Sequence, residues 1–596
     1  MNFETENLIA LYRQNRLKEA YQLANRLTIA QPDNHQAFNV LGLVLLAGNE
    51  NDKACISFKA AVKLSPKLVD YQFNLANAYI ASLDAEKAKK ILNKILKRDK
   101  KNVQAINSLG TINFNEQRYV VALDYFKQAI KINKNFLDAA YNIANTYSAM
   151  NEYSQAIKCF FEVYLKNKND NEVKLRIVNL YLKKGDFDQA YEFSKNDAVC
   201  LFNIAAYTEA KSELEMSSQA IDECLNIEPE NIKYKRLKAT ILRRKGELEK
   251  ALSILRDVVY DDVNIETKVF VEFELGKLHD KDKNYAEAFN HYKLANQFNN
   301  QINPVDSPAV TTFIEHLNSV YNTLTDGWYS SWKADLSSAV ERQPLFMVGF
   351  PRSGTTLLDQ ILDGHSDFVV MEELPIIGDV ILEAIRITGG QYPDLLSSIN
   401  KNTQNKLRDF YFKRVDEQFK YDKSKILVDK LPLNIIEIEM IHLLFPSSKV
   451  ILSMRHPFDV CLSNYMQHYS INGAMLTFNS LESTVITYDK VMRLWDKYIA
   501  VMPSLQAHVV CYEKLVDDIE VEVKALIEFL GVEWQPKILD FHLHALSRKS
   551  LNTPSYQQVT QSVYTTSRYR WKNYEKYIVD HFKFLNKYVQ LFNYDI

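Results

Sequence analysis

A loop that contains two glycines follows a short apolar run beyond the middle of the chain. The sequence reads LFMVGFPRSGTTLLDQIL, in which Leu345–Val348 suits a buried parallel strand and residues 355–362 suit a helix. A strand, a glycine-bearing loop and a helix N-terminus in this order direct backbone N–H groups at an anion. Arg352 adds a cation to the loop. This segment therefore predicts a binding site for a phosphate-type group.

The spacing of the two glycines and the residue after them limit which phosphate-bearing ligands are expected. Gly349 and Gly354 are separated as in the nucleotide-binding pattern G-x-x-x-x-G-K-[ST], but Thr355 stands where that pattern has its lysine. A triphosphate bound with magnesium normally uses this lysine. We therefore expect a phosphate-bearing donor other than a nucleoside triphosphate.

The segment PRSGTT after a strand resembles the 5′-phosphosulfate loop of sulfotransferases, which use 3′-phosphoadenosine 5′-phosphosulfate (PAPS). Similar loops occur in the protein-tyrosine sulfotransferase branch and in bacterial proteins that fuse tetratricopeptide repeats to such a domain. The resemblance covers about residues 344–575 and implies an α/β domain of the P-loop type with a parallel sheet. It also implies that the donor contacts Arg352, Ser353, Gly354, Thr355 and Thr356.

Two further segments match the reacting centre of that family. In VVMEELPIIG, the family's catalytic carboxylate lies eight residues after a histidine, here His365, which assigns this role to Glu373. The adjacent Glu372 should point elsewhere, because consecutive residues do not share a face. In KILVDKLPLN, residues 426–428 suit a strand, and the family's lysine that contacts the transferring sulfonate maps onto Lys430.

The remaining matches concern the nucleotide. In KVILSMRHPFDVCLSNY, Lys449–Met454 suits a strand, and Arg455 and Ser463 match the family's pair of 3′-phosphate ligands. Arginine suits this role because its planar guanidinium group can bind phosphate through two hydrogen bonds. Tyr512 resembles a residue that supports the nucleotide site, and Ser555 resembles a nucleotide contact.

The segment Tyr564–Trp571 resembles the closing segment of the family but departs from its pattern. Tyr569 precedes Arg570 where related bacterial chains commonly carry a glycine. Tyr564 stands where the tyrosine sulfotransferases have a lysine contact. The contacts of this segment with the nucleotide are therefore not assigned from the resemblance.

The resemblance implies transfer of a sulfonyl group from PAPS to an acceptor hydroxyl, without a metal. Glu373 would take the acceptor proton as general base, while Arg352, Lys430 and the loop amides would stabilise charge on the sulfonyl and phosphate oxygens. A peptide or protein is one candidate acceptor, and a glycan, lipid or small metabolite is another. Two alternatives stay open: a repeat scaffold whose C-terminal domain binds a nucleotide without catalysis, and an atypical P-loop kinase. The missing loop lysine counts against the kinase.

The first half of the chain repeats with a period of 34 residues. Alanine recurs at this step at Ala20, Ala54, Ala88, Ala122, Ala156 and Ala190. A pair such as Leu41-Gly42 or Leu109-Gly110 stands thirteen residues earlier, where two helices must approach closely. This pattern resembles the tetratricopeptide repeat, which is a pair of antiparallel helices. It predicts an all-α superhelix with about nine repeats, the first six regular, and a concave face that can take a protein partner.

Composition agrees with a helix-rich, multidomain chain. The 596 residues include only 15 glycines and 15 prolines, which favours helices joined by short connections. Because 72 basic residues nearly balance 74 acidic ones, a general nucleic-acid surface is not expected. No apolar run reaches the length of a membrane span and the N-terminus is unlike a signal peptide, so a cytoplasmic protein is expected. The predicted organisation is repeats at 1–300, a helical connector at 301–343 and the sulfotransferase-like domain at 344–596.

Overall fold

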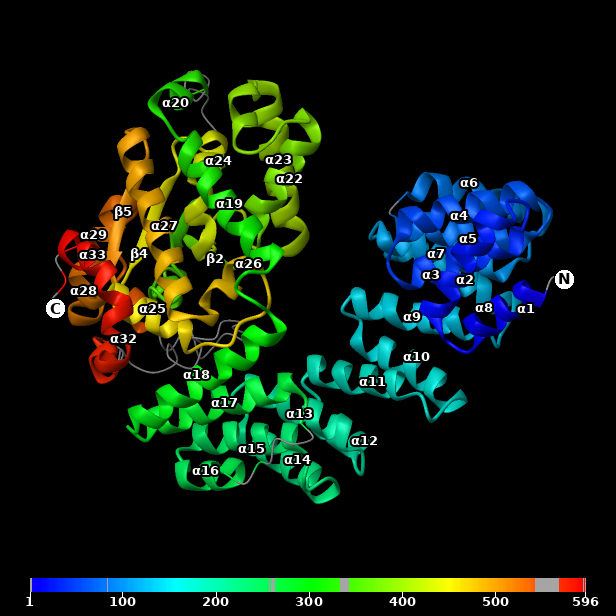
Figure 1. Cartoon of the computed structure of the whole chain (residues 1–596), viewed down its shortest axis with the longest axis horizontal. Coiled ribbons are helices and arrows are strands. Elements are labelled where there is room, and N and C mark those ends of the chain that lie inside the picture. Colours follow the sequence, from blue (N-terminus) through cyan, green and yellow to red (C-terminus); the bar gives the residue numbers. More distant parts are fainter. Residues whose placement is uncertain are drawn as a thin grey trace. The chain divides into compact units, whose positions relative to one another are not determined.

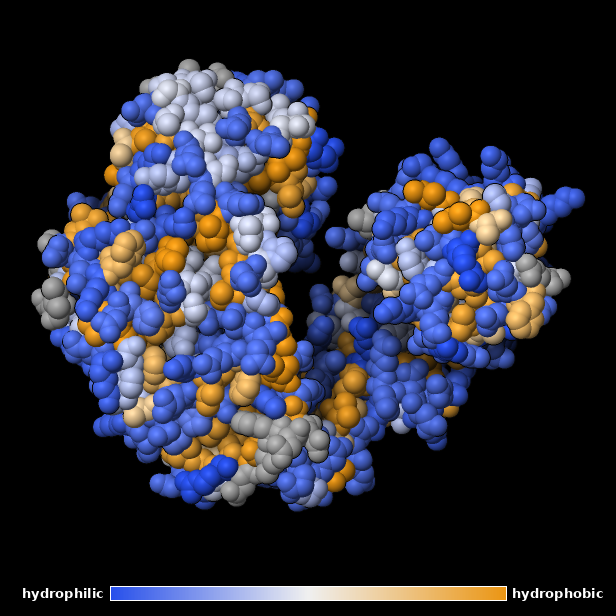
Figure 2. All heavy atoms as spheres, viewed as in Figure 1, coloured by the Kyte–Doolittle hydropathy of each residue, from blue (hydrophilic) through white to orange (hydrophobic). Residues whose placement is uncertain are grey.

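The computed structural model describes residues 3–82, 84–256, 258, 263–332, 342–541, 568–592 and 594. The chain divides into two compact units, Met1–Pro229 and Glu230–Ile596. In the described ranges, each helix is either too short or too polar to span a bilayer. The face of the molecule in Figure 2 is mostly hydrophilic, with apolar side chains in separate patches.

The first unit is a series of helical hairpins (Figure 1). Its helices are α1 (Phe3–Arg13), α2 (Leu17–Ala30), α3 (His35–Ala47), α4 (Asn51–Leu64), α5 (Val69–Ala81), α6 (Ala85–Arg98), α7 (Val103–Asn115), α8 (Tyr119–Ile132), α9 (Leu137–Ala149), α10 (Tyr153–Lys166), α11 (Asn171–Lys184), α12 (Phe187–Ser194), α13 (Ala198–Ala210) and α14 (Leu214–Ile227). The even-numbered helices from α2 to α12 begin 34 residues apart, so the predicted period is confirmed. After α12 the step shortens to 27 residues.

Small residues let the two helices of a hairpin approach closely. A Cβ atom placed at Gly42 would lie 2.7 Å from the ring of Phe58, and one at Gly110 would lie 2.5 Å from the ring of Phe126. The alanines that mark the period are fully buried, as at Ala54. The close helix contact therefore depends on the small residue types that the pattern requires.

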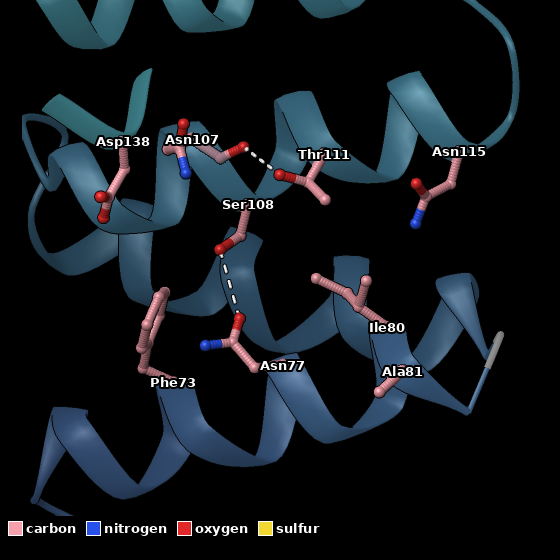
Figure 3. Close-up of a pocket in the computed structure, with 9 residues that line it drawn as sticks. All are labelled: Phe73, Asn77, Ile80, Ala81, Asn107, Ser108, Thr111, Asn115 and Asp138. Carbon is pink, nitrogen blue, oxygen red and sulfur yellow. Dashed lines mark hydrogen bonds between the residues drawn. The ribbon is translucent and has the colours of Figure 1, made fainter. Parts of the chain in front are cut away.

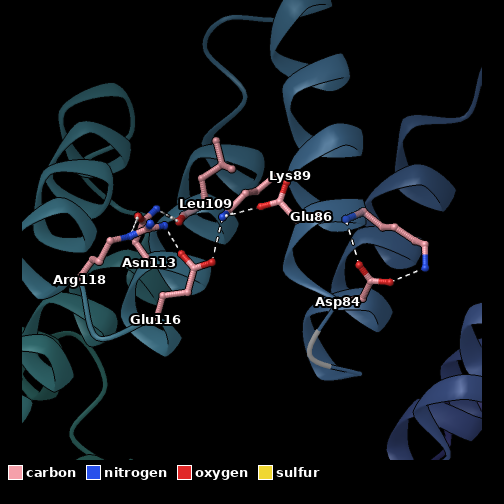
Figure 4. Close-up of polar contacts among 8 residues, drawn as sticks. Asp84, Glu86, Lys89, Leu109, Asn113, Glu116 and Arg118 are labelled. Atoms are coloured by element: carbon pink, nitrogen blue, oxygen red, sulfur yellow. Dashed lines mark hydrogen bonds and ion pairs between the residues drawn. The ribbon is translucent and has the colours of Figure 1, made fainter. Parts of the chain in front are cut away.

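Charged side chains join consecutive repeats at the surface (Figure 4). The Lys89 ammonium group donates to Glu86 Oε1 at 3.1 Å and to Glu116 Oε1 at 2.9 Å, and Glu116 belongs to the next repeat. Exposed ion pairs of this kind contribute about 0–1 kcal/mol each. Stacking of the repeats consequently rests on the buried apolar faces.

The second unit begins with two further hairpins and continues into an α/β domain. Its first helices are α15 (Ile232–Lys245), α16 (Leu248–Arg256), α17 (Ile265–Lys281), α18 (Tyr285–Ile302), α19 (Pro308–Thr323) and α20 (Asp326–Trp332). The Asn296 side chain of α18 donates to the Tyr465 carbonyl at 2.8 Å, and the ring of Phe289 stacks on that of Tyr577 at 4.7 Å. The last hairpin thus packs against the α/β domain. The predicted limits at residues 300 and 344 stay predictions.

The α/β domain is built on a five-stranded parallel sheet in the order β2-β3-β1-β4-β5. Its strands are β1 (Leu345–Gly349), β2 (Phe368–Glu372), β3 (Ile426–Lys430), β4 (Lys449–Met454) and β5 (Gln506–Cys511). Its helices are α21 (Thr355–Asp363), α22 (Ile376–Thr388), α23 (Lys401–Gln418), α24 (Ile438–Leu444), α25 (Pro457–Tyr465), α26 (Gly473–Leu476), α27 (Leu481–Val501), α28 (Tyr512–Asp517), α29 (Ile519–Leu530), α32 (Glu575–Phe582) and α33 (Asn586–Leu591). The short 3-10 helices are η2 (Asp394–Ser398), η3 (Pro432–Glu437), η4 (Thr477–Asn479), η5 (Pro536–Asp540), η7 (Arg570–Tyr574) and η8 (Lys583–Leu585).

Helices cover both faces of the sheet. Met347 and Ile451 pack in one core with α21 and α29, whereas Phe346 and Val450 pack in another with α22, α23, α24 and α27. Alternate residues of a strand point to opposite faces, and a parallel sheet must bury both. The predicted fold class, a helical repeat array followed by a parallel α/β domain, is confirmed.

Candidate active site

The carboxyl ends of the five strands carry residues that the sequence pattern had singled out. Arg352 lies in the loop after β1, Glu373 follows β2, Lys430 ends β3, Arg455 follows β4 and Tyr512 follows β5. In open parallel sheets, ligands bind outside the carboxyl ends of the strands. The fold therefore gathers these side chains where a ligand is expected.

Close packing shapes the loop between β1 and α21. A Cβ atom at Gly349 would lie 2.6 Å from the Ser453 carbonyl oxygen, and one at Gly354 would lie 2.7 Å from Cδ2 of Tyr512. Gly354 has a φ of +97° and Arg352 a φ of +71°, both in the left-handed region. The path of the loop thus requires glycine at positions 349 and 354.

Side chains from β4 and α25 fix the loop. The Asn464 amide donates to the Pro351 carbonyl at 2.9 Å, and the Ser453 hydroxyl donates to the Ser353 carbonyl at 2.9 Å. The loop leads into the N-terminus of α21, whose first N–H groups lack partners within the helix. Such a helix end attracts an anion.

A buried lysine joins two carboxylates beside this loop. Lys430 Nζ lies 3.0 Å from Asp359 Oδ2 and 3.0 Å from Glu373 Oε1. The side chains of Lys430 and Asp359 are fully buried, whereas that of Glu373 is 42% exposed. Burial alone would lower the pKa of Lys430, but the carboxylates of Asp359 and Glu373 outweigh it and raise the pKa. The ammonium group is thereby kept charged in a site that excludes water.

The backbone at Glu373 turns sharply as the strand ends. Its N–H donates to the Lys430 carbonyl at 2.7 Å, and its φ is +50°. A residue other than glycine in this region is uncommon and often belongs to a functional site. Glu373 is the exposed member of the lysine cluster, and hence the one that a molecule in solution can reach.

A second group of polar side chains lies between the loop and α25. Arg352 Nε donates to Ser463 Oγ at 3.1 Å, and Arg455 Nη1 donates to the Arg352 carbonyl at 3.4 Å. Arg455 Nη2 lies 3.5 Å from Asp459 Oδ2, and its guanidinium carbon lies 5.0 Å from the centroid of the Tyr512 ring. The predicted 3′-phosphate pair therefore shares one cluster with the loop arginine, and Ser463 contacts Arg352 directly.

Tyr469 interacts with both groups. Its hydroxyl donates to Asn464 Oδ1 at 2.7 Å. Burial raises the pKa of Tyr469, the nearby Arg352 lowers it and Glu373 raises it, with a rise as the outcome. The Tyr469 phenol is therefore kept protonated.

The structure thus places most of the predicted site residues together. Thr355 and Thr356 are buried in the first turn of α21, next to the loop. Ser555 and Tyr564 lie outside the described residues. Sequence reasoning missed Asp359, Asp459, Asn464 and Tyr469. In the parts of the chain that the structure describes, no group of three or more His, Cys, Asp or Glu side chains is arranged to hold a metal ion.

A separate cavity of about 540 Å³ lies in the first unit (Figure 3). It is lined by residues of α5, α7 and α9: Phe73, Asn77, Ile80, Ala81, Asn107, Ser108, Thr111, Asn115 and Asp138. The Ser108 hydroxyl donates to Asn77 Oδ1 at 3.4 Å, and the Asn142 amide donates to Asn107 Oδ1 at 3.0 Å. These amides belong to consecutive repeats, so polar groups continue along the first helices of the hairpins.

Comparison with known proteins agrees with both halves of the chain. Residues 344–536 match the sulfotransferase family. Residues 19–136 match the tetratricopeptide-repeat domain of cytochrome c-type biogenesis protein H, and residues 114–175 match the tetratricopeptide repeat. These matches fall on the α/β domain and on the helical hairpins respectively.

Individual relatives cover parts of the chain. An uncharacterized protein of Aquifex aeolicus (strain VF5) is 27% identical over 333 residues, which are 52% of this chain and 41% of that protein. Protein-tyrosine sulfotransferase 2 of Gallus gallus is 26% identical over 206 residues, 33% of this chain and 53% of that protein. The chain thus spans about half or less of the length of these two relatives. A solved tetratricopeptide-repeat protein of Parabacteroides merdae is 18% identical, with a TM-score of 0.29, over 40% of this chain and all of that one.

The two kinds of match agree with the architecture described above. The helical hairpins with a 34-residue step lie where the repeat families match. The parallel sheet and the glycine-bearing loop after β1 lie where the sulfotransferase family matches. The chain therefore joins an N-terminal array of tetratricopeptide repeats to a C-terminal domain of the sulfotransferase family.

Proposed function

We propose that the protein transfers a sulfonyl group from PAPS to the hydroxyl of an acceptor. The observation that carries this proposal is the contact between buried Lys430 and exposed Glu373, 3.0 Å apart, beside a phosphate loop without the nucleotide-triphosphate lysine. A cation for the sulfonate and a base for the hydroxyl are the two groups that this transfer needs. Both stand at the carboxyl end of the sheet.

In this proposal, the donor occupies the loop and the group of polar side chains formed by Arg352, Arg455 and Ser463. The loop N–H groups, the N-terminus of α21 and Arg352 would hold the 5′-phosphosulfate. Arg455 would bind the 3′-phosphate, assisted by Ser463. Tyr512, which packs on Gly354 and beneath Arg455, would keep both in place. Recognition of the 3′-phosphate would distinguish PAPS from ATP.

The reaction is a single displacement at sulfur. The acceptor oxygen forms a bond to sulfur as Glu373 takes its proton. The bond from sulfur to the 5′-phosphate oxygen breaks, and adenosine 3′,5′-bisphosphate leaves with the electron pair. Lys430, held by Asp359, would stabilise the negative charge on the sulfonyl oxygens, a contribution of about 10²–10³ in rate for one preorganised donor.

Transfer of labelled sulfonate from PAPS tests the assignment of Glu373. The variant Glu373→Gln keeps the shape of the side chain and removes the base, so turnover should fall about 10²–10⁴-fold. The matched control is Glu372→Gln, the same change at the adjacent residue, whose charge also raises the pKa of Lys430 but which is not the assigned base. Full turnover in Glu373→Gln would remove this residue from the base role.

Nucleotide binding tests the assignment of Arg455 separately from turnover. Calorimetry should show tighter binding of adenosine 3′,5′-bisphosphate than of adenosine 5′-monophosphate. Arg455→Ala should weaken bisphosphate binding about 10–100-fold, because a hydrogen bond to a charged group is lost. Glu373→Gln should leave it unchanged. Equal bisphosphate affinity in Arg455→Ala and wild type would contradict the 3′-phosphate assignment.

The acceptor hydroxyl, in this proposal, belongs to a peptide or protein, and the cavity lined by Asn77, Asn107 and Ser108 receives a protein partner. Amide and hydroxyl groups lining a cavity can bind the main chain of a polypeptide. The match to a relative named as a protein-tyrosine sulfotransferase supports a protein acceptor. A screen with labelled PAPS should detect transfer to peptides above transfer to glycans, lipids and small phenols. Transfer to glycans, lipids or small phenols alone would refute the protein acceptor.

A further inference from the structure

One carboxylate connects the last repeat to the C-terminal segment. Asp280, in the last turn of α17, has its Oδ2 atom 2.8 Å from Arg570 Nη2. Its Oδ1 atom accepts a hydrogen bond from the Tyr574 hydroxyl. Arg570 and Tyr574 are the two ends of η7. Both oxygens of Asp280 are therefore used to hold this short helix.

Asp280 stabilises the charged form of Arg570 and the protonated form of Tyr574. Burial would lower the pKa of Arg570, but Asp280 outweighs it and raises the pKa. Burial and then Asp280 raise the pKa of Tyr574, so its hydroxyl keeps the proton that it donates. Removing one partner of such a half-buried pair leaves the other charge poorly solvated. The position of η7 is consequently sensitive to the charge at residue 280.

The helix η7 in turn contacts the nucleotide site. The Trp571 backbone N–H donates to Asp459 Oδ1 at 2.8 Å, and the Trp571 ring stacks on the His456 imidazole with centroids 5.4 Å apart. The other oxygen of Asp459 lies 3.5 Å from Arg455 Nη2. An unbroken series of contacts thus leads from a repeat helix to the arginine assigned to the 3′-phosphate.

We propose that Asp280 is a positioning residue for donor binding. By fixing η7 it holds Trp571 and Asp459 in the places that orient Arg455. This inference rests on the proposed function, since it takes Arg455 as the 3′-phosphate ligand. Asp280 lies outside residues 344–536, which match the sulfotransferase family, so donor affinity depends on a helix of the repeat array.

Calorimetry on the full chain with two nucleotides tests the proposal. Asp280→Asn keeps the size of the side chain and removes its charge. Its dissociation constant for adenosine 3′,5′-bisphosphate should rise about 3–30-fold, the usual range for residues that act through others. Affinity for adenosine 5′-monophosphate should stay within about twofold, since that nucleotide lacks the 3′-phosphate. Asp280→Glu should restore most of the bisphosphate affinity, and Asp282→Asn, an exposed neighbour, should match wild type.

The outcomes separate this inference from the function on which it rests. If the wild-type protein does not bind adenosine 3′,5′-bisphosphate, the proposed function is refuted. Normal binding by wild type with equal affinity in Asp280→Asn would overturn only the inference. Equal weakening of both nucleotides would also overturn it, because it would indicate a general loss of structure. If Asp280→Asn does not fold, Arg570→Lys disturbs the same contact and must show the same selective loss.

Discussion

Replacing Lys430 by methionine separates the structural part of the site from its chemistry. Methionine has a similar length and remains apolar where the side chain is fully buried. The change removes the ammonium group 3.0 Å from the Asp359 carboxylate, which is also fully buried. Removing one partner of a buried ion pair costs about 3–5 kcal/mol. The contact to Glu373 adds little, because that carboxylate is 42% exposed and water can solvate it.

A second substitution tells the two roles of Lys430 apart. Asp359→Asn, combined with Lys430→Met, removes the buried carboxylate and keeps an acceptor for the Gln360 amide, 2.7 Å away. The double variant should recover most of the lost free energy of unfolding. Its sulfonate transfer should stay about 10²–10³-fold below wild type, because the cation for the sulfonyl group is still missing.

Urea unfolding gives the free energy of unfolding, and transfer of labelled sulfonate gives the catalytic rate. Both are measured on the same preparations. Unfolding of Lys430→Met within about 1 kcal/mol of wild type would contradict the argument from the buried ion pair. A transfer rate in the double variant equal to that of wild type would show that the ammonium group takes no part in the reaction. Either result would refute the reasoning for this residue.

Three further predictions concern stability. Burial raises the pKa of Asp429 to about 7, so between pH 5 and pH 7 the native state holds a proton that the unfolded state releases. The free energy of unfolding, measured in urea titrations, should therefore fall by about 1 kcal/mol per unit as the pH rises from 5 to 7. Asp429→Asn should remove this pH dependence. Gly110→Ala should destabilise the first unit by about 1–3 kcal/mol in thermal unfolding, because its Cβ would lie 2.5 Å from Phe126, whereas Gly378→Ala, which meets open space, should not. Burial lowers the pKa of Lys277, the nearby Glu274 raises it and three arginines lower it, with a fall as the outcome, so Lys277→Met should stabilise the second unit by up to about 1 kcal/mol in thermal unfolding at pH 7.

The local elements could be predicted from the sequence because each depends on neighbouring residues. The 34-residue step is confirmed by the starts of the even-numbered helices from α2 to α12, and the strands begin at Leu345, Ile426 and Lys449, as predicted from the sequence. The glycine spacing indicated the turn between β1 and α21 for the same reason, since the turn needs particular residues at fixed offsets. These elements are therefore determined by local sequence and do not depend on contacts between distant segments.

Contacts between distant segments could not be predicted in this way. Asp359 stands in a helix where an acidic residue ordinarily faces water, and only the fold shows that it is buried against Lys430. Asp280 is one of several charges near the end of a repeat helix, and nothing near it in the sequence indicates Arg570. Partners of this kind depend on how the sheet and the last hairpin pack.

The close packing of the last hairpin limits how this protein can vary in evolution. In the first unit, helices of one repeat bury their faces against neighbouring repeats of the same design, so a block of 34 residues can be duplicated or lost and the new junction still fits. The hairpin of α17 and α18 is different, because Asn296, Phe289 and Asp280 are matched to partners in the α/β domain. Related chains should therefore differ in the number of early repeats and keep this final one. We expect the repeat that ends the array to be inherited together with the α/β domain that it contacts.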